Sequence, residues 1–255
     1  MQAAYKTHIG CVRAFNEDNG AVVNLENGNL MAIVADGMGG HQAGDVASLM
    51  AVDIVKMELQ NLPDDLGPDE AIDRLDQAIL KANDAIYSYS KSHDDCHGMG
   101  TTIAACLVNP EWLVIGHIGD SRIYRVSDKQ ITQLTEDHSL VNELLKNGQI
   151  TKEEAANHPQ KNILVRALGT DYDVEVELKA LEWEPGDRLI LCSDGLSNKV
   201  VPGDIMRIVN AAGTLDQAVG ELLQAALRAG GEDNITAIVI AEYDEPRAER
   251  SEVSG

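Results

Sequence analysis

Apolar residues are gathered in six short continuous runs, separated by segments of polar or mixed composition. Short apolar runs bounded by turn residues are typical of buried β-strands. We therefore predict strands at Leu30–Ala35, Thr102–Val108, Trp112–Ile118, Arg122–Val126, Arg188–Cys192 and Ile235–Ala241. The sequence Asn109-Pro110-Glu111 between the second and third runs predicts a hairpin turn.

Two longer segments, Gly44–Leu59 and Pro68–Ser92, repeat their apolar residues at steps of three and four. This spacing places the apolar side chains on one face, as in an amphipathic helix. Thr151 and Thr214 are each followed three residues later by Glu or Gln, which is the spacing of a capping box and predicts the start of two further helices.

The predicted elements do not alternate regularly between strand and helix, which disfavours a doubly wound parallel sheet. The order predicts an α+β fold in which helices cover a mainly antiparallel sheet core. Residues 139–168 are polar and helix-rich, and we interpret them as an insertion that covers one edge of a single domain spanning residues 1–243. Residues 244–255 are polar and are predicted to be a disordered tail.

Composition adds limits on function. The hydrophobic fraction of 44% is sufficient for a continuous core, and the net charge of −22 argues against binding to a nucleic-acid backbone. The four cysteines form no C-x-x-C pair, so neither a zinc ribbon nor a redox pair is predicted. Without a signal-like start or a span-length apolar segment, we expect a cytoplasmic monomer with no membrane or nucleic-acid partner.

Four aspartates, Asp36, Asp120, Asp194 and Asp233, stand next to predicted strands. Carboxylates at such positions are costly unless a cation neutralises them, and they would repel one another if they lay together. Oxygen ligands of this kind suit hard divalent cations such as Mg²⁺ and Mn²⁺. The sequence therefore predicts a site for several metal ions.

Each of these motifs also has a simpler interpretation. The segment Asp36–His41 lacks the glycines of a dinucleotide fingerprint, so it is either a glycine-rich turn or a loop that offers the Gly37 carbonyl to an ion. An isolated Asp is more often a turn or cap residue. Asp120 also has Arg122 nearby as a possible ion-pair partner.

Arg13 and two histidines are further candidates for residues of the functional site. A guanidinium beside a metal cluster can hold two phosphoryl oxygens in a fork, although Arg13 could instead pair with Glu17 or Asp18 on the surface. His41 is a candidate general acid, or a solvent-facing residue at a helix start. His138 is expected to make a structural hydrogen bond.

Other hydrolytic chemistries lack their residues. A cysteine-nucleophile phosphatase needs an Arg six positions after the Cys, where this chain has Glu17, Thr102, Trp112 and Asn198. The chain has no Gly-x-Ser-x-Gly elbow and no His-Glu-x-x-His helix. Metal-activated water remains as the expected nucleophile.

In combination, these motifs resemble the PPM (protein phosphatase 2C, PP2C) family of metal-dependent serine/threonine protein phosphatases, in its bacterial form. The resemblance covers nearly the whole chain and rests on several motifs in the same order: Arg13–Asp18, Asp36–Gly44, Gly100-Thr101-Thr102, Gly119–Arg122, Thr135–Ser139, Arg166–Gly169, Cys192–Leu196 and Asp233-Asn234. It implies a four-layer αββα sandwich, with two antiparallel sheets flanked by helices.

The resemblance also implies the ligand set. Asp36 would bridge two Mg²⁺ or Mn²⁺ ions, with the Gly37 carbonyl on one ion and Asp194 and Asp233 on the other. Asp120 would join Asp194 in holding a weaker third ion.

Further roles follow from the same resemblance. Arg13 matches the phosphate-binding arginine, and Glu17 and Asp18 match acids that act on the ions through water molecules. Residues 140–165 would form a flap beside the active site. Many eukaryotic members carry a His directly after the Asp-Gly pair, where this chain has Met38, so the general acid is either His41 or water.

The function implied is hydrolysis of phosphoserine and phosphothreonine by metal-activated water, without a phosphoenzyme intermediate. The substrates would be phosphoproteins, and a bacterial Ser/Thr kinase would be the opposing partner. Two alternatives remain: a metal-dependent nuclease or phosphodiesterase, and a metal-binding regulatory module without catalytic activity.

Overall fold

Two antiparallel sheets form the centre of the computed structural model, which describes residues 1–39 and 43–242. The first sheet has the order β1-β11-β10-β7-β8, and the second has the order β2-β3-β5-β6-β9, with the short β4 beside β3. The bounds are β1 Gln2–His8, β2 Asp18–Asn24, β3 Leu30–Met38, β4 Gly100–Thr101, β5 Ile103–Val108, β6 Trp112–Ile118, β7 Arg122–Val126, β8 Ile131–Gln133, β9 Glu177–Glu182, β10 Arg188–Cys192 and β11 Ile235–Ala241.

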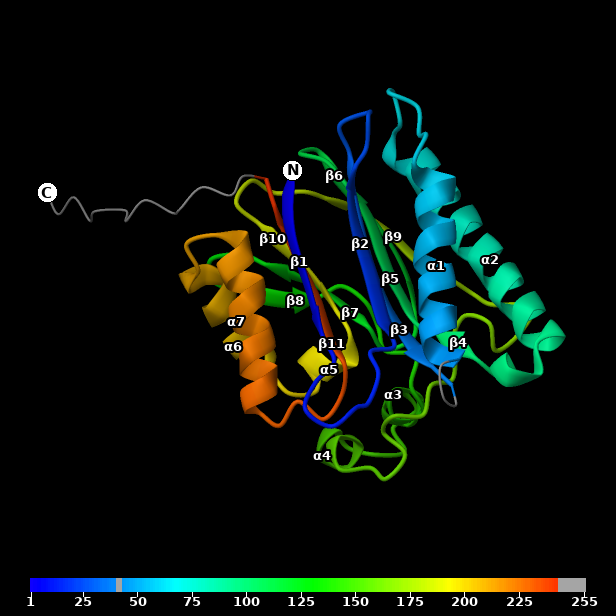
Figure 1. Cartoon of the computed structure of the whole chain (residues 1–255). Helices are drawn as coiled ribbons and strands as arrows, with labels where there is room; N and C mark the ends of the chain where they lie inside the picture. Colours follow the sequence, from blue (N-terminus) through cyan, green and yellow to red (C-terminus); the bar gives the residue numbers. More distant parts are fainter. Residues whose placement is uncertain (40–42, 243–255) are drawn as a thin grey trace, which may run out of the picture.

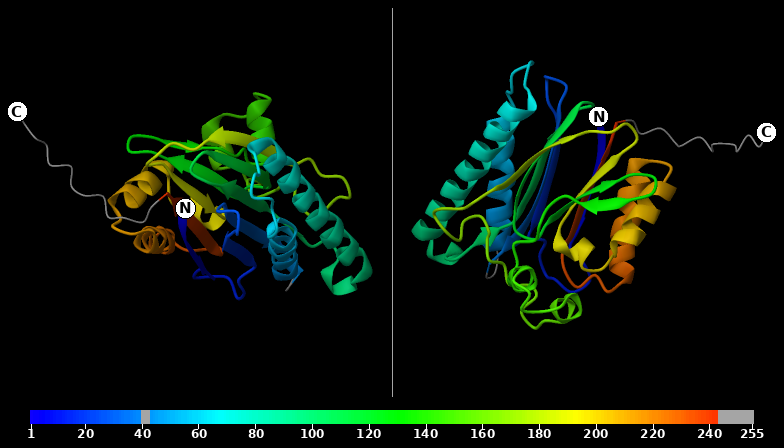
Figure 2. Two further views of the ribbon diagram at one scale, coloured as in Figure 1. Left: turned by 90° about the horizontal axis from the view of Figure 1, so that it is seen from above. Right: turned by 180° about the vertical axis from the view of Figure 1, so that it is seen from behind.

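Helices cover the outer faces of both sheets (Figures 1 and 2). Helices α1 and α2 pack on the second sheet, and α6 and α7 cover the first. The helical bounds are α1 Ala43–Leu59, α2 Pro68–Ser92, η1 Asp94–Cys96, α3 Leu140–Lys146, α4 Lys152–Ala156, α5 Asp194–Ser197, α6 Pro202–Ala211 and α7 Leu215–Arg228. The expected αββα sandwich is therefore confirmed.

Strand β3 runs through the hydrophobic core and has a polar residue, Asp36, near its end. Its odd-numbered residues from Met31 to Ala35 lie in the hydrophobic cluster under α1 and α2, whereas Leu30, Ala32 and Val34 lie in the cluster between the two sheets. Because side chains alternate between the faces of a strand, Asp36 continues the face that looks toward the other sheet. The strand thus carries a carboxyl group to one end of the inter-sheet core.

The six strands predicted from apolar runs are the six central strands of the two sheets, and the helix Pro68–Ser92 has its predicted bounds. The predicted turn after β5 is confirmed, since the Asn109 amide donates to the Trp112 carbonyl at 3.1 Å. Strand β3 is longer than predicted and continues through Asp36 to Met38. The sequence did not predict β1, β2, β8 and β9, which are the four edge strands.

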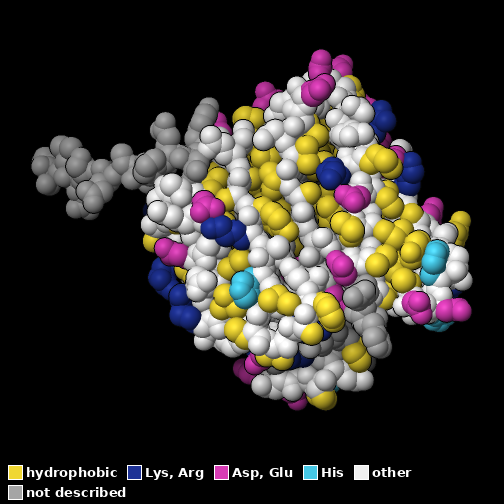
Figure 3. Space-filling view, in the orientation of Figure 1, with side chains coloured by type: hydrophobic (Ala, Val, Ile, Leu, Met, Phe, Trp, Pro, Cys, Tyr) yellow, Lys and Arg dark blue, Asp and Glu magenta, His cyan; other side chains and the backbone are white. Residues whose placement is uncertain are grey.

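Helices α3 and α4 occupy the connection between β8 and β9, where the insertion was predicted. Helix α4 begins with a complete capping box, in which Thr151 accepts from the Glu154 amide and Glu154 accepts from the Thr151 amide. Apolar side chains reach the surface along the open edge of the sandwich, where β1 and β2 lie side by side (Figure 3). Within the described residues, no helix has both the length and the apolar character needed to cross a membrane. The predicted tail, residues 244–255, lies outside the described residues.

Candidate metal centre

Four aspartate carboxyl groups from distant parts of the chain, together with that of Glu17, line one cavity of about 190 Å³. Asp36 lies near the end of β3, and Asp120 lies in the turn between β6 and β7. Asp194 follows β10 and Asp233 precedes β11, and these strands are antiparallel neighbours, so the end of one lies beside the start of the other. The topology therefore gathers the four predicted aspartates at one end of the sandwich.

These carboxyl groups are crowded, and those of Asp36, Asp120 and Asp194 are largely removed from solvent, whereas the Asp233 side chain is 35% exposed. Burial raises the pKa of Asp36 well above its usual range, and the nearby charges of Asp18 and Asp194 raise it further. Burial raises the pKa of Asp120 to about 8, with a further contribution from Asp194. Burial and Asp233 raise the pKa of Asp194 to about 6. The cluster thus holds more negative charge than its surroundings compensate, and a bound cation would reverse these shifts.

Two further acids carry oxygen atoms that have no partner. Glu17 Oε1 and Asp18 Oδ1 are buried and accept no hydrogen bond from any described residue. Asp18 is anchored through its other oxygen, which accepts a 2.7 Å hydrogen bond from the Ser193 hydroxyl. Buried polar atoms are rarely left unsatisfied, so these oxygens indicate places for water molecules or cations. An oxygen-only donor set with unsatisfied acceptors fits Mg²⁺ or Mn²⁺.

The backbone at Gly37 approaches its neighbours too closely for any side chain. The Gly37 amide donates to the Glu17 carbonyl at 3.1 Å, and a Cβ atom at Gly37 would lie 2.1 Å from the Gly44 carbonyl oxygen. A Cβ atom at Gly44 would in turn lie 2.5 Å from Glu17 Oε1. The two glycines therefore allow the β3 end, the start of α1 and the Glu17 segment to converge at the cavity.

Arg13 is the only Lys or Arg among the described residues that line this cavity. Its Nη2 donates to Asp233 Oδ2 at 2.8 Å, and its Nη1 lies 3.9 Å from Glu17 Oε2. The side chain remains 48% exposed, so the guanidinium stands at the mouth of the cavity. The local alternative, a pair with Glu17, is present only as the longer of these two contacts.

The alternative partner for Asp120 is engaged elsewhere. Arg122 donates from Nε and Nη2 to the carboxylate of Asp137, at distances of 2.9 and 2.6 Å. Arg122 lowers the pKa of Asp120 only as a minor influence beside burial and the charges of Asp194 and Asp137. Asp120 is therefore left with a raised pKa and with its carboxylate on the cavity.

Sequence reasoning missed several polar residues of the site. Thr102 Oγ1 accepts from the Asp36 amide at 2.9 Å and shares a 2.7 Å hydrogen bond with the Ser121 hydroxyl. Asn234 Oδ1 accepts from the Glu17 amide at 2.8 Å. Asn162, from the insertion, also lines the cavity. The usable signal was a polar residue inside or beside an apolar run, as at Thr102. His41, the candidate general acid, lies outside the described residues.

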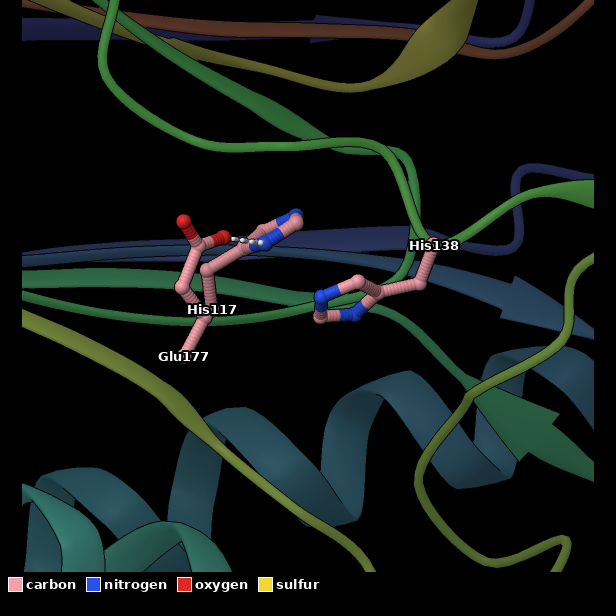
Figure 4. Close-up of side chains that lie close together, drawn as sticks. All are labelled: His117, His138 and Glu177. Carbon is pink, nitrogen blue, oxygen red and sulfur yellow. Dashed lines mark hydrogen bonds and ion pairs between the residues drawn. The ribbon is translucent and has the colours of Figure 1, made fainter. Parts of the chain in front are cut away.

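A second cluster, formed by His117, His138 and Glu177, lies outside this cavity (Figure 4). His117 Nδ1 and Glu177 Oε2 are 3.0 Å apart, and the Glu136 amide donates to the same oxygen at 3.0 Å. Lys179 lies 2.6 Å from Glu177 Oε1. The ammonium group of Lys179 already compensates the charge of this carboxylate, although His117 Nε2 is buried and has no hydrogen-bond partner among the described residues.

The expected structural hydrogen bond of His138 is confirmed. Its Nδ1 accepts from the Gly119 amide at 3.2 Å, and its own amide donates to the Gly119 carbonyl at 2.7 Å. The His138 carbonyl accepts from the Val165 amide at 2.9 Å. His138 thus joins the turn that carries Asp120 to both ends of the insertion.

Comparisons with known proteins agree with this geometry. The model of the protein phosphatase 2C family matches residues 8–235. The chain is 43% identical over 240 residues to the serine/threonine phosphatase stp of Listeria monocytogenes, which covers 94% of this chain and 95% of that protein. It is similar to the crystal structure of the serine/threonine phosphatase Stp1 from Staphylococcus aureus, with a TM-score of 0.89, 38% identity and coverage of 94% of each chain.

A further solved structure carries metal ions. It is the catalytic domain of the serine/threonine protein phosphatase PstP in complex with two manganese ions. The similarity has a TM-score of 0.81 at 36% identity and covers 93% of this chain and 96% of that chain.

Proposed function

The chain belongs to the protein phosphatase 2C family and is a serine/threonine protein phosphatase, and on this premise we propose that it hydrolyses phosphoserine and phosphothreonine at the cavity described above, with two Mn²⁺ or Mg²⁺ ions. One observation carries the proposal: four aspartates and a single arginine, from five separate segments, line the same small cavity. Phosphoproteins produced by a Ser/Thr kinase are the expected substrates.

The proposed ion ligands are those that the family resemblance implies. Asp36, the Gly37 carbonyl, Asp194 and Asp233 would hold the two ions. Asp120 and Asp194 would hold a weaker third ion. When bound, such ions lower the pKa of water and offset negative charge on phosphoryl oxygens. The raised pKa values of Asp36, Asp120 and Asp194 support this assignment, because they show that the protein does not supply enough positive charge to neutralise these carboxylates.

Arg13 binds the phosphoryl group in this proposal. Its Nη2 is held by Asp233, which orients the planar guanidinium at the cavity mouth. A guanidinium in this position can donate to two phosphoryl oxygens at once. Glu17 Oε1 and Asp18 Oδ1 are free to accept hydrogen bonds from water in the cavity and thereby to orient it.

No free hydroxyl or thiol nucleophile lines the described part of the cavity, which supports direct attack by water. Thr102 carries the only hydroxyl group among the described lining residues, and its oxygen already accepts from the Asp36 amide and bonds Ser121. The Cys192 thiol is buried, and burial raises its pKa to about 12. The phosphoryl group therefore passes to water in one step. The leaving oxygen would be protonated either by His41 or by water, and turnover of His41→Ala distinguishes these two predictions.

The direct test uses metal-free protein and a phosphothreonine peptide. Phosphate release is expected on addition of Mn²⁺ and should stop on addition of excess chelator. Chelator-resistant release would contradict the proposal. Bis-p-nitrophenyl phosphate tests the phosphodiesterase alternative, and turnover of the diester that exceeds turnover of p-nitrophenyl phosphate would favour that alternative.

A further inference from the structure

The loop that carries Arg13 exposes apolar side chains. We call residues Ile9–Phe15 the Arg13 loop. Val12 is 69% exposed and Phe15, the only phenylalanine of the chain, is 56% exposed. Ile9, at the start of the loop, is 36% exposed. Ile163 and Val165, which flank the cavity-lining residue Leu164 on the insertion, are also 44% and 46% exposed. Val201, at the start of α6, stands on a separate element, and an isolated exposed apolar side chain of this kind is ordinary for a protein surface.

The Arg13 loop is held firmly in spite of its exposure. Asn234 Nδ2 donates to the carbonyls of both Ile9 and Phe15 at 2.9 Å, which closes the loop at its base. The Cys11 amide donates to the Gly231 carbonyl at 2.6 Å. Gly10 has a φ of +84°, and a Cβ atom there would lie 2.2 Å from the Asp233 carbonyl oxygen. The apolar side chains are therefore presented on a backbone that is already ordered, which lowers the entropic cost of binding.

The small size of the cavity determines which parts of a peptide substrate must lie outside it, on the Arg13 loop. At about 190 Å³ the cavity is below the usual range for drug-sized ligands, so it can admit a phosphoryl group but not a peptide. Consecutive Cα atoms are about 3.8 Å apart, so the residues that flank the phosphorylated one must rest on the rim. Val12 and Ala14 flank Arg13, and both are exposed, as is Phe15 beside them.

We propose that the Arg13 loop binds a large apolar residue directly next to the phosphorylated Ser or Thr of an extended substrate segment, an inference that rests on the proposed function. Exposed apolar groups on an ordered loop mark an interaction site. The cavity beside them is lined with carboxylates and the chain carries a net charge of −22, so acidic flanking residues are disfavoured. Leu, Ile or Phe beside the phosphorylated residue is the chemistry that fits.

The experiment compares phosphothreonine peptides that differ only beside the phosphorylated residue, with Leu, Ser or Glu on either side. Wild-type protein is expected to show kcat/KM values about tenfold higher for the Leu peptides than for the Ser peptides, which corresponds to about 1.4 kcal/mol. Phe15→Ala and the double variant Val12→Ala/Phe15→Ala should lose this preference. p-Nitrophenyl phosphate has no flanking residues, so its turnover should not change in either variant.

Val201→Ala is the matched control, because Val201 is 61% exposed and distant in sequence from every cavity residue except Asp194. This variant should keep the wild-type preference. Equal kcat/KM values across the peptides in wild type, or a Leu preference that persists in the double variant, would overturn the inference while leaving the phosphatase assignment intact. Absence of metal-dependent phosphate release from every substrate would instead overturn the proposed function, and the inference with it.

Discussion

The carboxylate cavity and the cluster of His117, His138 and Glu177 are two groups of buried titratable side chains with opposite electrostatics. In the cavity, burial and neighbouring acids raise the pKa of Asp120 to about 8 and that of Asp194 to about 6. In the histidine cluster, burial would raise the pKa of Glu177, but hydrogen bonds from His117 and Lys179 lower it to about 2.

The difference shows how a site for an external cation can be distinguished from a structural network. Each oxygen of Glu177 has a donor from the protein itself. Glu17 and Asp18, beside the cavity, each keep one buried oxygen without a partner. A network that compensates its own charge needs nothing from outside, whereas an uncompensated cluster is costly until a cation arrives. Proximity of potential ligands alone would have favoured the histidine cluster among the described residues, because its ligand atoms lie within 4.8 Å of one another.

The largest effect is expected from Asp194→Asn. The substitution keeps the shape of the side chain but removes one charge from the proposed ligand set. We expect kcat in saturating Mn²⁺ to fall by roughly 10²–10³-fold, the scale for loss of one central catalytic group. In the metal-free state the variant should be as stable as wild type or more stable, because repulsion with Asp233 is relieved.

Urea unfolding in chelator measures this second effect. Asp204→Asn, which changes an exposed carboxylate paired with Arg207, is the control and should alter neither quantity. If Asp194→Asn retained full turnover, the ligand assignment would be wrong. A metal-free variant that unfolded more easily than wild type would contradict the electrostatic contrast between the two clusters.

A smaller effect is expected at Arg13, the only Lys or Arg among the described residues on the cavity. Arg13→Ala should raise KM for a phosphopeptide by about 10–100-fold, because hydrogen bonds to a charged group contribute about 1.5–3 kcal/mol. Arg13→Lys keeps the charge but lacks the planar fork, so it should recover only part of the loss. Isothermal titration with Mn²⁺ should show binding retained in both variants. Wild-type KM values in Arg13→Ala would remove the phosphate-binding role.

A substitution in the histidine cluster should lower the stability of the protein but leave its stabilisation by metal ions unchanged. Glu177→Gln removes the charge that Lys179 and His117 share, and we expect the free energy of unfolding to fall by about 1–2 kcal/mol after allowance for partial solvent screening. The increase in Tm on addition of Mn²⁺ should match that of wild type. Glu175→Gln, at an exposed surface pair with Arg166, is the control. A reduced Mn²⁺ effect in Glu177→Gln would show that this cluster also binds the ion.

The fold was predictable where strands are buried on both faces. All six central strands carry continuous apolar runs, whereas β1, β2, β8 and β9 lie at the sheet edges. Strand β9 is the clearest example, because its sequence ELKALE has no apolar run and its residues are half-buried or exposed. An edge strand pairs on one side only and can keep a polar face, so its amino-acid pattern does not stand out from that of a loop.

The charged residues of the candidate site were predictable from the sequence, but the contacts that hold them in place were not. Asp36 and Asp194 stand out because each follows an apolar run, and charge is unexpected there. The contact between Arg13 and Asp233 spans almost the whole chain, so no local pattern indicates it. Thr102 and Asn234 have hydrogen-bonding roles that depend on which backbone groups lie beside them. Folding alone determines those neighbours.

The smallest expected effect is a difference between the two clusters in how their contribution to stability depends on pH. Asp120 and Asp194 have folded-state pKa values above those of the unfolded chain, so the stability they contribute is present at low pH and is lost as pH rises toward 8. His138, with its pKa lowered to about 4 by burial, and Glu177, at about 2, contribute stability that is lost as pH falls below about 6.

Metal-free protein should therefore lose stability between pH 6 and 8 by at most about 1.4 kcal/mol per pH unit for each proton that the native state retains. Urea unfolding in chelator measures this slope. Saturating Mn²⁺ should abolish or reverse it, since bound ions favour the ionised carboxylates. The loss of stability below about pH 4.5, to which Glu177 contributes through its lowered pKa, should be smaller in Glu177→Gln. If the free energy of unfolding changed with pH in the same way with and without Mn²⁺ above pH 6, the cavity acids would not bind the ions. The proposed electrostatic difference between the two clusters would then be wrong.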